Sequence, residues 1–147
     1  MRETFNKVLI TGGAGMLAHA LVATLSRRDV QPIVRSRADL DITQPNTVSQ
    51  IWELGPSLIL NCAAFTKVDL CEVESETCTL VNATAPSILA QCAMRIGAKL
   101  VHFSTDFVFN GKANKPYAPH DAVFPILAYG ASKAIGERAL KRRLTVP

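Results

Sequence analysis

Aromatic residues are scarce in this 147-residue sequence, where Phe, Trp and Tyr together make up 6%. They do not interleave with the basic residues, as they would in a protein that stacks the bases of nucleic acid on aromatic side chains. The formal net charge is +4 and the pI is about 9.0, yet Lys and Arg are scattered along the chain. We therefore expect no nucleic-acid partner, and attribute the positive charge to an anionic small ligand and an ordinary surface.

Long hydrophobic runs are also missing. None approaches the roughly 18–20 residues that a membrane-spanning helix requires, and the N-terminus lacks the apolar stretch of a signal peptide. These absences predict a soluble, cytoplasmic protein without a membrane partner.

Cysteine is limited to four residues, with no C-x-x-C pair and no histidine at zinc-finger spacing: Cys62, Cys71, Cys78 and Cys92. The pattern predicts no metal site. Because a disulfide framework is not expected in a cytosolic protein, we expect Cys62 and Cys92, which lie in apolar segments, to be buried free thiols.

The order of apolar segments predicts the fold. Hydrophobic residues make up 48% of the chain and charged residues 19%, as in a folded globular domain. Short apolar runs predict strands over residues 7–11, 31–35, 58–61 and 99–104, and helical periodicity predicts helices over 15–28, 43–54, 75–97 and 129–143. Pro86 should kink or break the third helix. Continuously apolar strands that alternate with helices predict an α/β fold with a Rossmann-type doubly wound parallel sheet.

A glycine-rich turn follows the first predicted strand. Gly12, Gly15 and Ala18 give the spacing G-x-x-G-x-x-A before an amphipathic helix. Gly12 can form the tight turn, Gly15 lets the backbone approach a pyrophosphate, and Ala18 lets the helix pack closely on the sheet. A merely structural turn is the alternative, but the position between strand and helix favours a dinucleotide site.

The end of the second predicted strand bears on the choice of cofactor. An Asp or Glu about 20 residues after the glycines would hold the ribose of NAD(H), but here Arg35 stands twenty residues after Gly15. Arginine pairs well with a 2′-phosphate. We therefore favour NADP(H), with NAD(H) as the alternative if Arg35 and Arg37 are only surface charges.

Tyr129 and Lys133 are spaced to share one face of the last predicted helix. An ammonium near a tyrosine favours the phenolate, and such a tyrosine can donate a proton to a carbonyl oxygen as hydride reaches its carbon. A helix can contain this pair by chance. Together with the glycine-rich turn and the segment Ser104-Thr105-Asp106 after the fourth strand, it predicts a reducing site at the carboxyl ends of the strands.

These segments resemble those of a known family, the extended short-chain dehydrogenase/reductases, and within it the dTDP-4-dehydrorhamnose reductases. The motifs that carry the resemblance are Val8-Leu-Ile-Thr-Gly-Gly-Ala-Gly-Met-Leu17, Asp39-Leu-Asp-Ile-Thr43, Leu60-Asn-Cys-Ala-Ala-Phe-Thr-Lys-Val-Asp69, Val81-Asn82-Ala83, Phe103-Ser-Thr-Asp-Phe-Val-Phe-Asn-Gly111 and Tyr129-Gly-Ala-Ser-Lys133. The resemblance implies NAD(P)H-dependent reduction of a nucleotide-linked 4-keto-6-deoxysugar, within dTDP-rhamnose biosynthesis.

The resemblance also implies roles for individual residues. The cofactor pyrophosphate would lie along Gly12, Gly15, Met16 and Leu17, its adenine at Asp41 and Ile42, and further parts of it against Cys62, Ala63 and Ala64. Thr105 would orient the substrate, Tyr129 would be the general acid, and Lys133 would hold the nicotinamide ribose. The alternative for Asp41 is a carboxylate that only starts a helix. Asn82 is either the family's helix asparagine or a surface or capping amide.

The chain also departs from the family. Phe65 and Phe107 stand where the family usually has tyrosine, and full members are about twice as long. We therefore expect residues 1–147 to be an incomplete NAD(P)-binding Rossmann domain, inactive alone and without the substrate domain: the product of a truncated gene, a fragment, or one part of a protein that a partner completes. The expected partners are a second copy in a homo-oligomer or a complementing C-terminal chain. The alternative function is a non-catalytic, NADP-binding regulatory subunit that resembles the beta-subunit of methionine adenosyltransferase.

Overall fold

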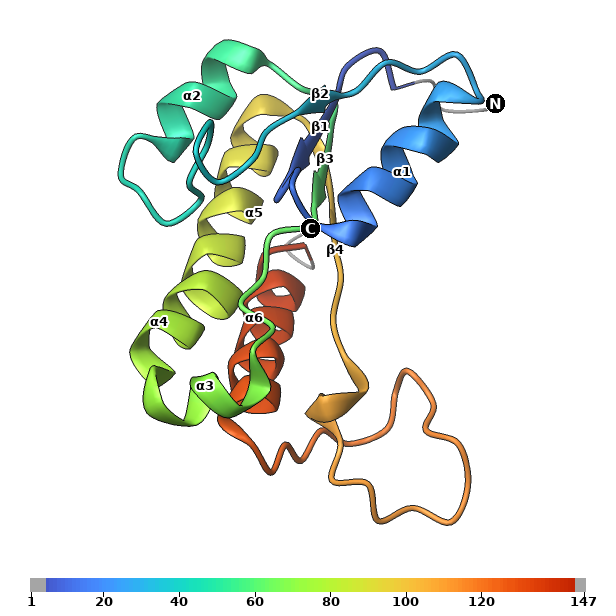
Figure 1. Ribbon diagram of the computed structural model, residues 1–147, viewed down its shortest axis with the longest axis vertical. Helices are drawn as coiled ribbons and strands as arrows, with labels where there is room; N and C mark the ends of the chain where they lie inside the picture. The colour runs from blue at the N-terminus through green and yellow to red at the C-terminus, as the bar shows by residue number, and fades with distance from the viewer. Residues whose placement is uncertain (1–4, 145–147) are drawn as a thin grey trace.

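Four parallel strands form the sheet at the centre of the molecule. The computed structural model describes residues 5–144, with side chains up to residue 142, so the polar first residues 1–4 and the end at 145–147 lie outside the described part (Figure 1). The strands are β1 (Val8–Thr11), β2 (Ile33–Val34), β3 (Leu58–Asn61) and β4 (Lys99–His102), in the spatial order β2-β1-β3-β4. All neighbouring pairs are parallel. Strand β2 lies on one side of β1, and β3 and β4 follow on the other side. The strand order thus reverses between β1 and β3, as in a doubly wound sheet.

Helices cover both faces of this sheet (Figure 1). The α-helices are α1 (Met16–Ser26), α2 (Thr47–Leu54), α3 (Val68–Val73), α4 (Ser75–Thr79), α5 (Ala85–Ile96) and α6 (Ala128–Leu144). On one face, α1 packs through Leu21, Val22 and Leu25 against Val8 and Ile10. The other face is covered by α2 and α5.

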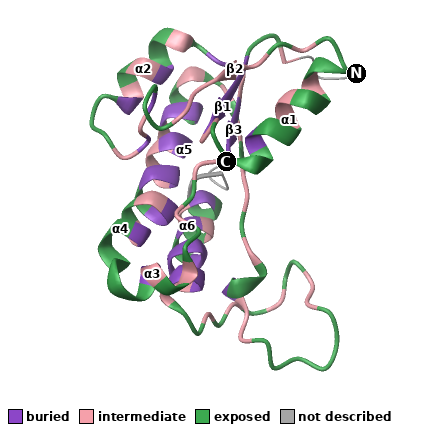
Figure 2. Cartoon of the chain, viewed as in Figure 1, coloured by how far each residue is buried: buried purple, intermediate pink, exposed green. Residues whose placement is uncertain are grey.

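The core follows from the alternation of side chains along the strands. Leu9 of β1 and Ile59 of β3 share one cluster with Ile51 of α2 and Leu89 of α5, all of them fully buried (Figure 2). Because successive strand side chains point to opposite faces, Val8, Ile10 and Leu60 turn to α1 instead. Both faces of β1 and β3 are therefore buried, which confirms the doubly wound Rossmann-type sheet expected from their continuous apolar runs.

The predicted strands and helices differ from the observed ones mainly at their ends. β3 has its predicted bounds, whereas β2 has only two residues and β4 ends at His102. Helix α2 begins at Thr47 rather than at 43, because the preceding residues form turns around Asp41. Helix α3 was not predicted, since six residues are too few to show a helical period.

The predicted long helix over 75–97 is instead three segments in succession. Between α4 and α5 lies a π-helical turn, η1 (Leu80–Thr84), and Pro86 follows it in the first turn of α5. Proline has no N–H to donate to the carbonyl four residues earlier, which is that of Asn82. That carbonyl faces α6 at Gly136, where an added Cβ would lie 2.4 Å from the Asn82 oxygen. The break expected near Pro86 therefore coincides with a close approach of α6 to η1.

A long connection joins β4 to α6 and projects from the body of the fold (Figure 1). It contains one short 3-10 turn, η2 (Asp106–Val108), and is largely exposed or half-buried (Figure 2). Phe109 and Tyr117 stack in it with their ring centroids 4.2 Å apart. Helix α6 then returns alongside α5 and η1.

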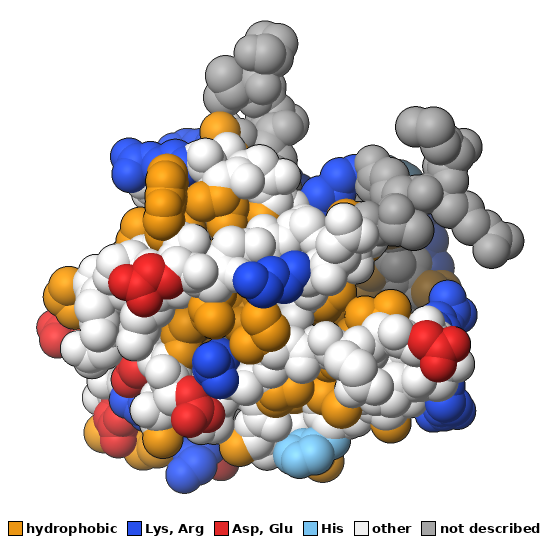
Figure 3. Space-filling view, turned by 90° about the horizontal axis from the view of Figure 1, so that it is seen from above, with side chains coloured by type: hydrophobic (Ala, Val, Ile, Leu, Met, Phe, Trp, Pro, Cys, Tyr) orange, Lys and Arg blue, Asp and Glu red, His pale blue; other side chains and the backbone are white. Residues whose placement is uncertain are grey.

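The surface carries charges of both signs. On the face shown in Figure 3, lysine and arginine side chains are scattered among acidic and hydrophobic ones instead of forming one basic stripe. No helix among the described residues is long and apolar enough to cross a membrane.

Candidate functional site

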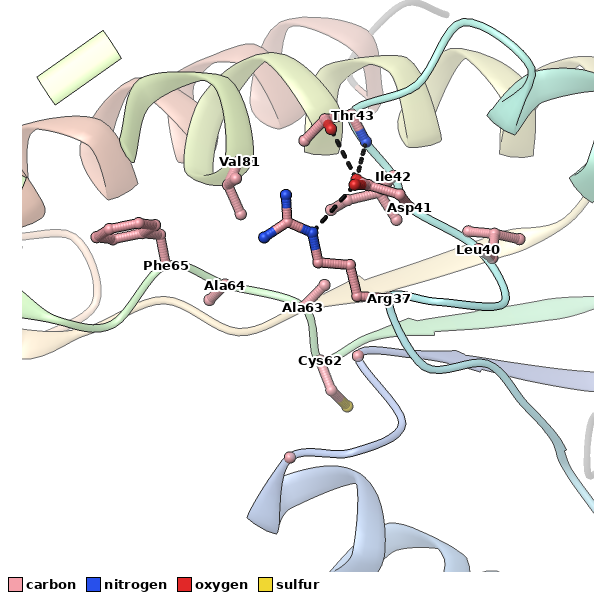
Figure 4. A pocket seen from close by; sticks show the side chains of 12 residues that line it. Arg37, Leu40, Asp41, Ile42, Thr43, Cys62, Ala63, Ala64, Phe65 and Val81 are labelled. Carbon is pink, nitrogen blue, oxygen red and sulfur yellow. Dashed lines mark hydrogen bonds and ion pairs between the residues drawn. The ribbon is translucent and has the colours of Figure 1, made fainter. Parts of the chain in front are cut away.

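A cavity of about 240 Å³ lies at the carboxyl ends of β1 and β3, where the sheet changes direction (Figure 4). This is the place where open α/β sheets bind ligands. Its walls come from the β1–α1 turn, the segment before α2, the segment after β3, and η1. The lining residues are Gly12, Gly15, Arg37, Leu40, Asp41, Ile42, Thr43, Cys62, Ala63, Ala64, Phe65 and Val81.

The glycine-rich turn forms one wall by close backbone packing. Gly12 has φ +66°, and a Cβ there would lie 2.6 Å from the Ala63 nitrogen. The Gly15 N–H donates to the Gly12 carbonyl at 2.9 Å, and Gly15 is also the N-cap of α1. The structure thus shows why position 12 needs glycine, and it starts α1, with its partial positive charge, at the cavity.

Asp41 forms the opposite wall. Its Oδ1 accepts from the Thr43 backbone N–H at 3.0 Å and from the Thr43 hydroxyl at 2.7 Å, and its Oδ2 accepts from Arg37 Nε at 3.0 Å. Burial alone would raise the pKa of Asp41, but these hydrogen bonds outweigh it and hold the pKa below its ordinary value. Asp41 is therefore a carboxylate that both shapes the turn before α2 and faces the cavity, so the two roles weighed for it are compatible.

The two arginines near β2 are placed differently. Arg37 reaches across the cavity toward Asp41 and Val81 (Figure 4), although its side chain is 80% exposed. Arg35 lines a separate surface depression, with Glu53 and other residues of α2. The structure therefore does not bring Arg35, the residue expected at a 2′-phosphate, to the cavity; it brings Arg37.

Tyr129 and Lys133 are both buried on α6, with 8% and 2% exposure. Tyr129 packs with the thiols of Cys71 and Cys78, and its ring meets that of Phe107 edge-on at 5.6 Å. Lys133 donates to the Phe103 carbonyl, and burial lowers its pKa from the ordinary lysine value. Its described contacts are thus with the end of β4, and neither Tyr129 nor Lys133 lines the cavity.

Three further predicted residues lie outside the cavity. The Thr105 hydroxyl accepts from the Phe107 N–H at 3.3 Å and so caps η2. Thr105 also lines a second depression, of about 410 Å³, beside β4 and α6. Met16 and Leu17 are exposed at the start of α1, with Met16 92% exposed.

The alternative prediction for Asn82, a surface or capping amide, is wrong. Asn82 is fully buried in η1. Its amide accepts from the Phe65 N–H and donates to the Phe65 carbonyl, both at 2.9 Å, and donates to the Ser132 hydroxyl at 3.0 Å. Asn82 therefore ties the segment that lines the cavity to α6, which carries Tyr129 and Lys133.

The four cysteines are free thiols, as was predicted for Cys62 and Cys92. Cys92 is buried, but Cys62 is only half-buried because it lines the cavity. Burial raises the pKa of both thiols, and it is the main reason why the pKa of Cys71 rises to about 12. Within residues 5–142, no three His, Cys, Asp or Glu side chains are grouped so that they could hold a metal ion.

Sequence reasoning missed several lining residues. Leu40, Thr43, Phe65 and Val81 stand inside the motifs that carry the family resemblance, but none was assigned to the site. Periodicity could not reveal them, because apolar side chains that line a cavity look like core residues in a sequence. The signal that could have found them is their adjacency to Asp41, Ala64 and Asn82.

Comparison with known proteins identifies the family. The sequence profile of the RmlD substrate binding domain family matches residues 6–146. The chain belongs to this family. This member is 39% identical over 136 residues to dTDP-4-dehydrorhamnose reductase of Burkholderia thailandensis, and 37% identical over 138 residues to the reductase of that name from Mycobacterium tuberculosis. Each match covers 91% of this chain but 45% of the relative. The chain thus spans less than half the length of these curated relatives.

Solved structures agree with this assignment. The RmlD-family chain superposes on a dTDP-4-dehydrorhamnose reductase of Clostridium acetobutylicum with a TM-score of 0.89 and 39% identity, covering 92% of this chain and 49% of that one. The reductase of Bacillus anthracis, solved in complex with NADP, also gives a TM-score of 0.89, with 36% identity and coverage of 97% and 51%. Both confirm the predicted fold and the resemblance on which the residue roles rest.

Proposed function

We propose that this chain is the cofactor-binding part of an NADP(H)-dependent reductase that acts on a nucleotide-linked 4-keto-6-deoxysugar, as in dTDP-rhamnose biosynthesis. The observation that carries the proposal is the cavity between the Gly12 turn and Asp41, at the switch point of a doubly wound sheet. The relatives' names support the reaction, and the NADP complex of the Bacillus anthracis reductase supports the cofactor. NAD(H) is the alternative cofactor.

The chain's own residues fit one end of such a cofactor. About 240 Å³ is below the roughly 300–1,000 Å³ of a site for a whole ligand, so the cavity suits the adenosine end. Ile42 and the small side chains of Ala63 and Ala64 give it apolar walls. The start of α1 offers backbone N–H groups to a phosphate, and the Arg37 guanidinium offers the charge that a 2′-phosphate requires.

The reducing chemistry would take place near α6. When bound, the cofactor supplies a hydride to the substrate ketone. Tyr129 would donate the proton to the ketone oxygen, and Thr105, at the end of β4, would orient the substrate by its hydroxyl. Lys133 would hold the cofactor ribose. The part of the relatives that this chain does not cover would provide the remaining substrate contacts, so we propose that residues 1–147 form the NAD(P)-binding domain only.

The cofactor assignment is tested by titrating the protein with NADPH and NADH at fixed salt. We expect tighter binding of NADPH. Arg37→Ala should weaken NADPH binding about 10- to 100-fold, since a charge-assisted hydrogen bond contributes about 1.5–3 kcal/mol, and should leave NADH binding nearly unchanged. Arg35→Ala is the matched control, because its side chain lies outside the cavity. Equal affinities for both cofactors, or a larger effect of Arg35→Ala, would contradict the assignment.

The reaction is tested by following NADPH oxidation with a dTDP-4-keto-6-deoxysugar in the longest natural form of the protein. Tyr129→Phe should reduce turnover about 10²–10⁴-fold, as loss of a general acid does, and should spare cofactor binding. Tyr117→Phe, in the connection before α6, is the control for loss of a tyrosine hydroxyl. Cofactor binding without any turnover in the wild type would instead support the non-catalytic regulatory subunit.

A further inference from the structure

A polar ladder crosses the carboxyl ends of three neighbouring strands. Thr11, Asn61 and His102 end β1, β3 and β4 and are paired in register. The Thr11 hydroxyl donates to Asn61 Oδ1 at 2.6 Å, and Asn61 Nδ2 lies 3.0 Å from His102 Nδ1. Thr11 and Asn61 are buried, at 0% and 1% exposure. The three side chains follow Leu9, Ile59 and Leu100 by two residues, and so they point to the face covered by α5.

The hydrogen bonds around Asn61 determine where its amide oxygen lies. The Ala63 backbone N–H, which can only donate, points to Asn61 Oδ1 at 3.3 Å. The amide nitrogen must therefore be the atom that faces His102 Nδ1, and it donates to that ring nitrogen. A neutral imidazole carries one proton. With Nδ1 as an acceptor, the proton of His102 resides on Nε2.

Lys133 meets this Nε2 from α6. Its Nζ lies 3.3 Å from His102 Nε2 and also donates to the Phe103 carbonyl. An ammonium has three donors and no acceptor, so Nε2–H and a charged Lys133 would meet donor to donor. An uncharged amine accepts from Nε2–H and donates to Phe103. In this arrangement no donor faces another donor between Thr11 and the Phe103 carbonyl.

We propose that His102 is a positioning residue for Lys133: held by Asn61 with its proton on Nε2, it donates to the Lys133 amine and keeps that amine at the end of β4. The consequence for the reaction rests on the proposed function. To hold the cofactor ribose as an ammonium, Lys133 would have to leave His102 and take up a proton.

The environments of His102 and Lys133 shift both pKa values toward the uncharged side chains. Burial is the main cause that lowers the pKa of His102, to about 4, so the ring is neutral near pH 7. Burial also lowers the pKa of Lys133, against the opposing effects of Glu137 on α6 and Cys78 on α4. Glu137 in turn accepts a hydrogen bond from the Ser104 hydroxyl. Tyr129 lies one turn earlier on α6 and packs with Cys71 and Cys78.

The test is the protonation of the two His102 ring nitrogens, measured by ¹⁵N NMR on the ligand-free protein near pH 7. We expect a proton on Nε2 and none on Nδ1. In Asn61→Asp, two acceptor oxygens replace the amide, so Nδ1 should become protonated, and the midpoint of the Lys133 titration should rise by about one to three pH units. His102→Gln can present the same acceptor to Asn61 and the same donor to Lys133, and should leave that midpoint near its wild-type value.

The wild-type measurement alone decides the proposal, even if Asn61→Asp does not fold. A proton on Nδ1 with a bare Nε2, or protons on both nitrogens near pH 7, would overturn it. So would a Lys133 titration midpoint above pH 7, because the side chain would then be an ammonium and could not accept from Nε2–H. The measurement uses the ligand-free protein. Its failure would therefore leave the proposed function standing, and a failure to bind NADPH would leave this measurement unaffected.

Discussion

Replacing Asn82 by alanine should destabilise the fold and the candidate site together. The amide makes a pair of hydrogen bonds with the backbone N–H and carbonyl of Phe65 and a third with the Ser132 hydroxyl. Asn82 itself is fully buried. Alanine can make none of these contacts, and the space of the lost amide lies between the cavity wall and α6.

The lost hydrogen bonds determine how far the free energy of unfolding should fall. A buried polar group that loses its partner costs about 1–3 kcal/mol. Two backbone groups of Phe65 lose theirs, but Phe65 is only half-buried, so water can reach part of the site. We therefore expect Asn82→Ala to lower the free energy of unfolding by about 2–4 kcal/mol, a large share of the roughly 5–15 kcal/mol of a typical domain.

The assay is urea denaturation followed by circular dichroism, with the NADPH affinity of the still-folded variant as a second readout. Asn46→Ala is the matched control, because Asn46 is exposed and its side chain makes no cap hydrogen bond to α2. It should change the free energy of unfolding by less than about 0.5 kcal/mol. If Asn82→Ala costs less than about 1 kcal/mol, or no more than the control, then the amide does not hold the two segments together and the reasoning is refuted.

Three further predictions concern close packing and pH. Gly12→Ala should destabilise the protein by about 2–5 kcal/mol, combining a left-handed backbone with a backbone clash. Gly97→Ala, also at positive φ but with open space, should cost only about 1–2 kcal/mol in the same denaturation assay; equal losses would argue against the clash. Gly136→Ala should lower the melting temperature by pushing α6 off the Asn82 carbonyl, and an unchanged melting temperature would disprove that contact. Because the pKa of His102 is about 4 when folded and 6.5 when unfolded, the unfolded state takes up the proton first. Stability should therefore fall from pH 6.5 to pH 4 by up to about 3 kcal/mol, and melts of His102→Gln should lack that part of the slope.

The sequence by itself determined the features that depend on residues close together in the chain. The apolar run before Gly12 and the helical period after Gly15 are local, and β1 and α1 lie where these patterns place them. Continuous apolar strands between helices also predicted the parallel sheet, because such strands must be covered on both faces. Gly12, Asp41 and Ala63 could be named from motifs, and they do line one cavity.

Only the tertiary structure decided which distant side chains meet. Arg37 rather than Arg35 faces the cavity because of the turns that lead from β2 to α2, which no periodicity describes. Asn82 bonds to Phe65 and Ser132, seventeen and fifty residues away. His102 meets Asn61 because parallel strands pair in register, and it meets Lys133 because α6, packed alongside α5 and η1, brings Lys133 to the end of β4. Such contacts depend on how whole helices and strands pack, and a local sequence pattern carries no record of that packing.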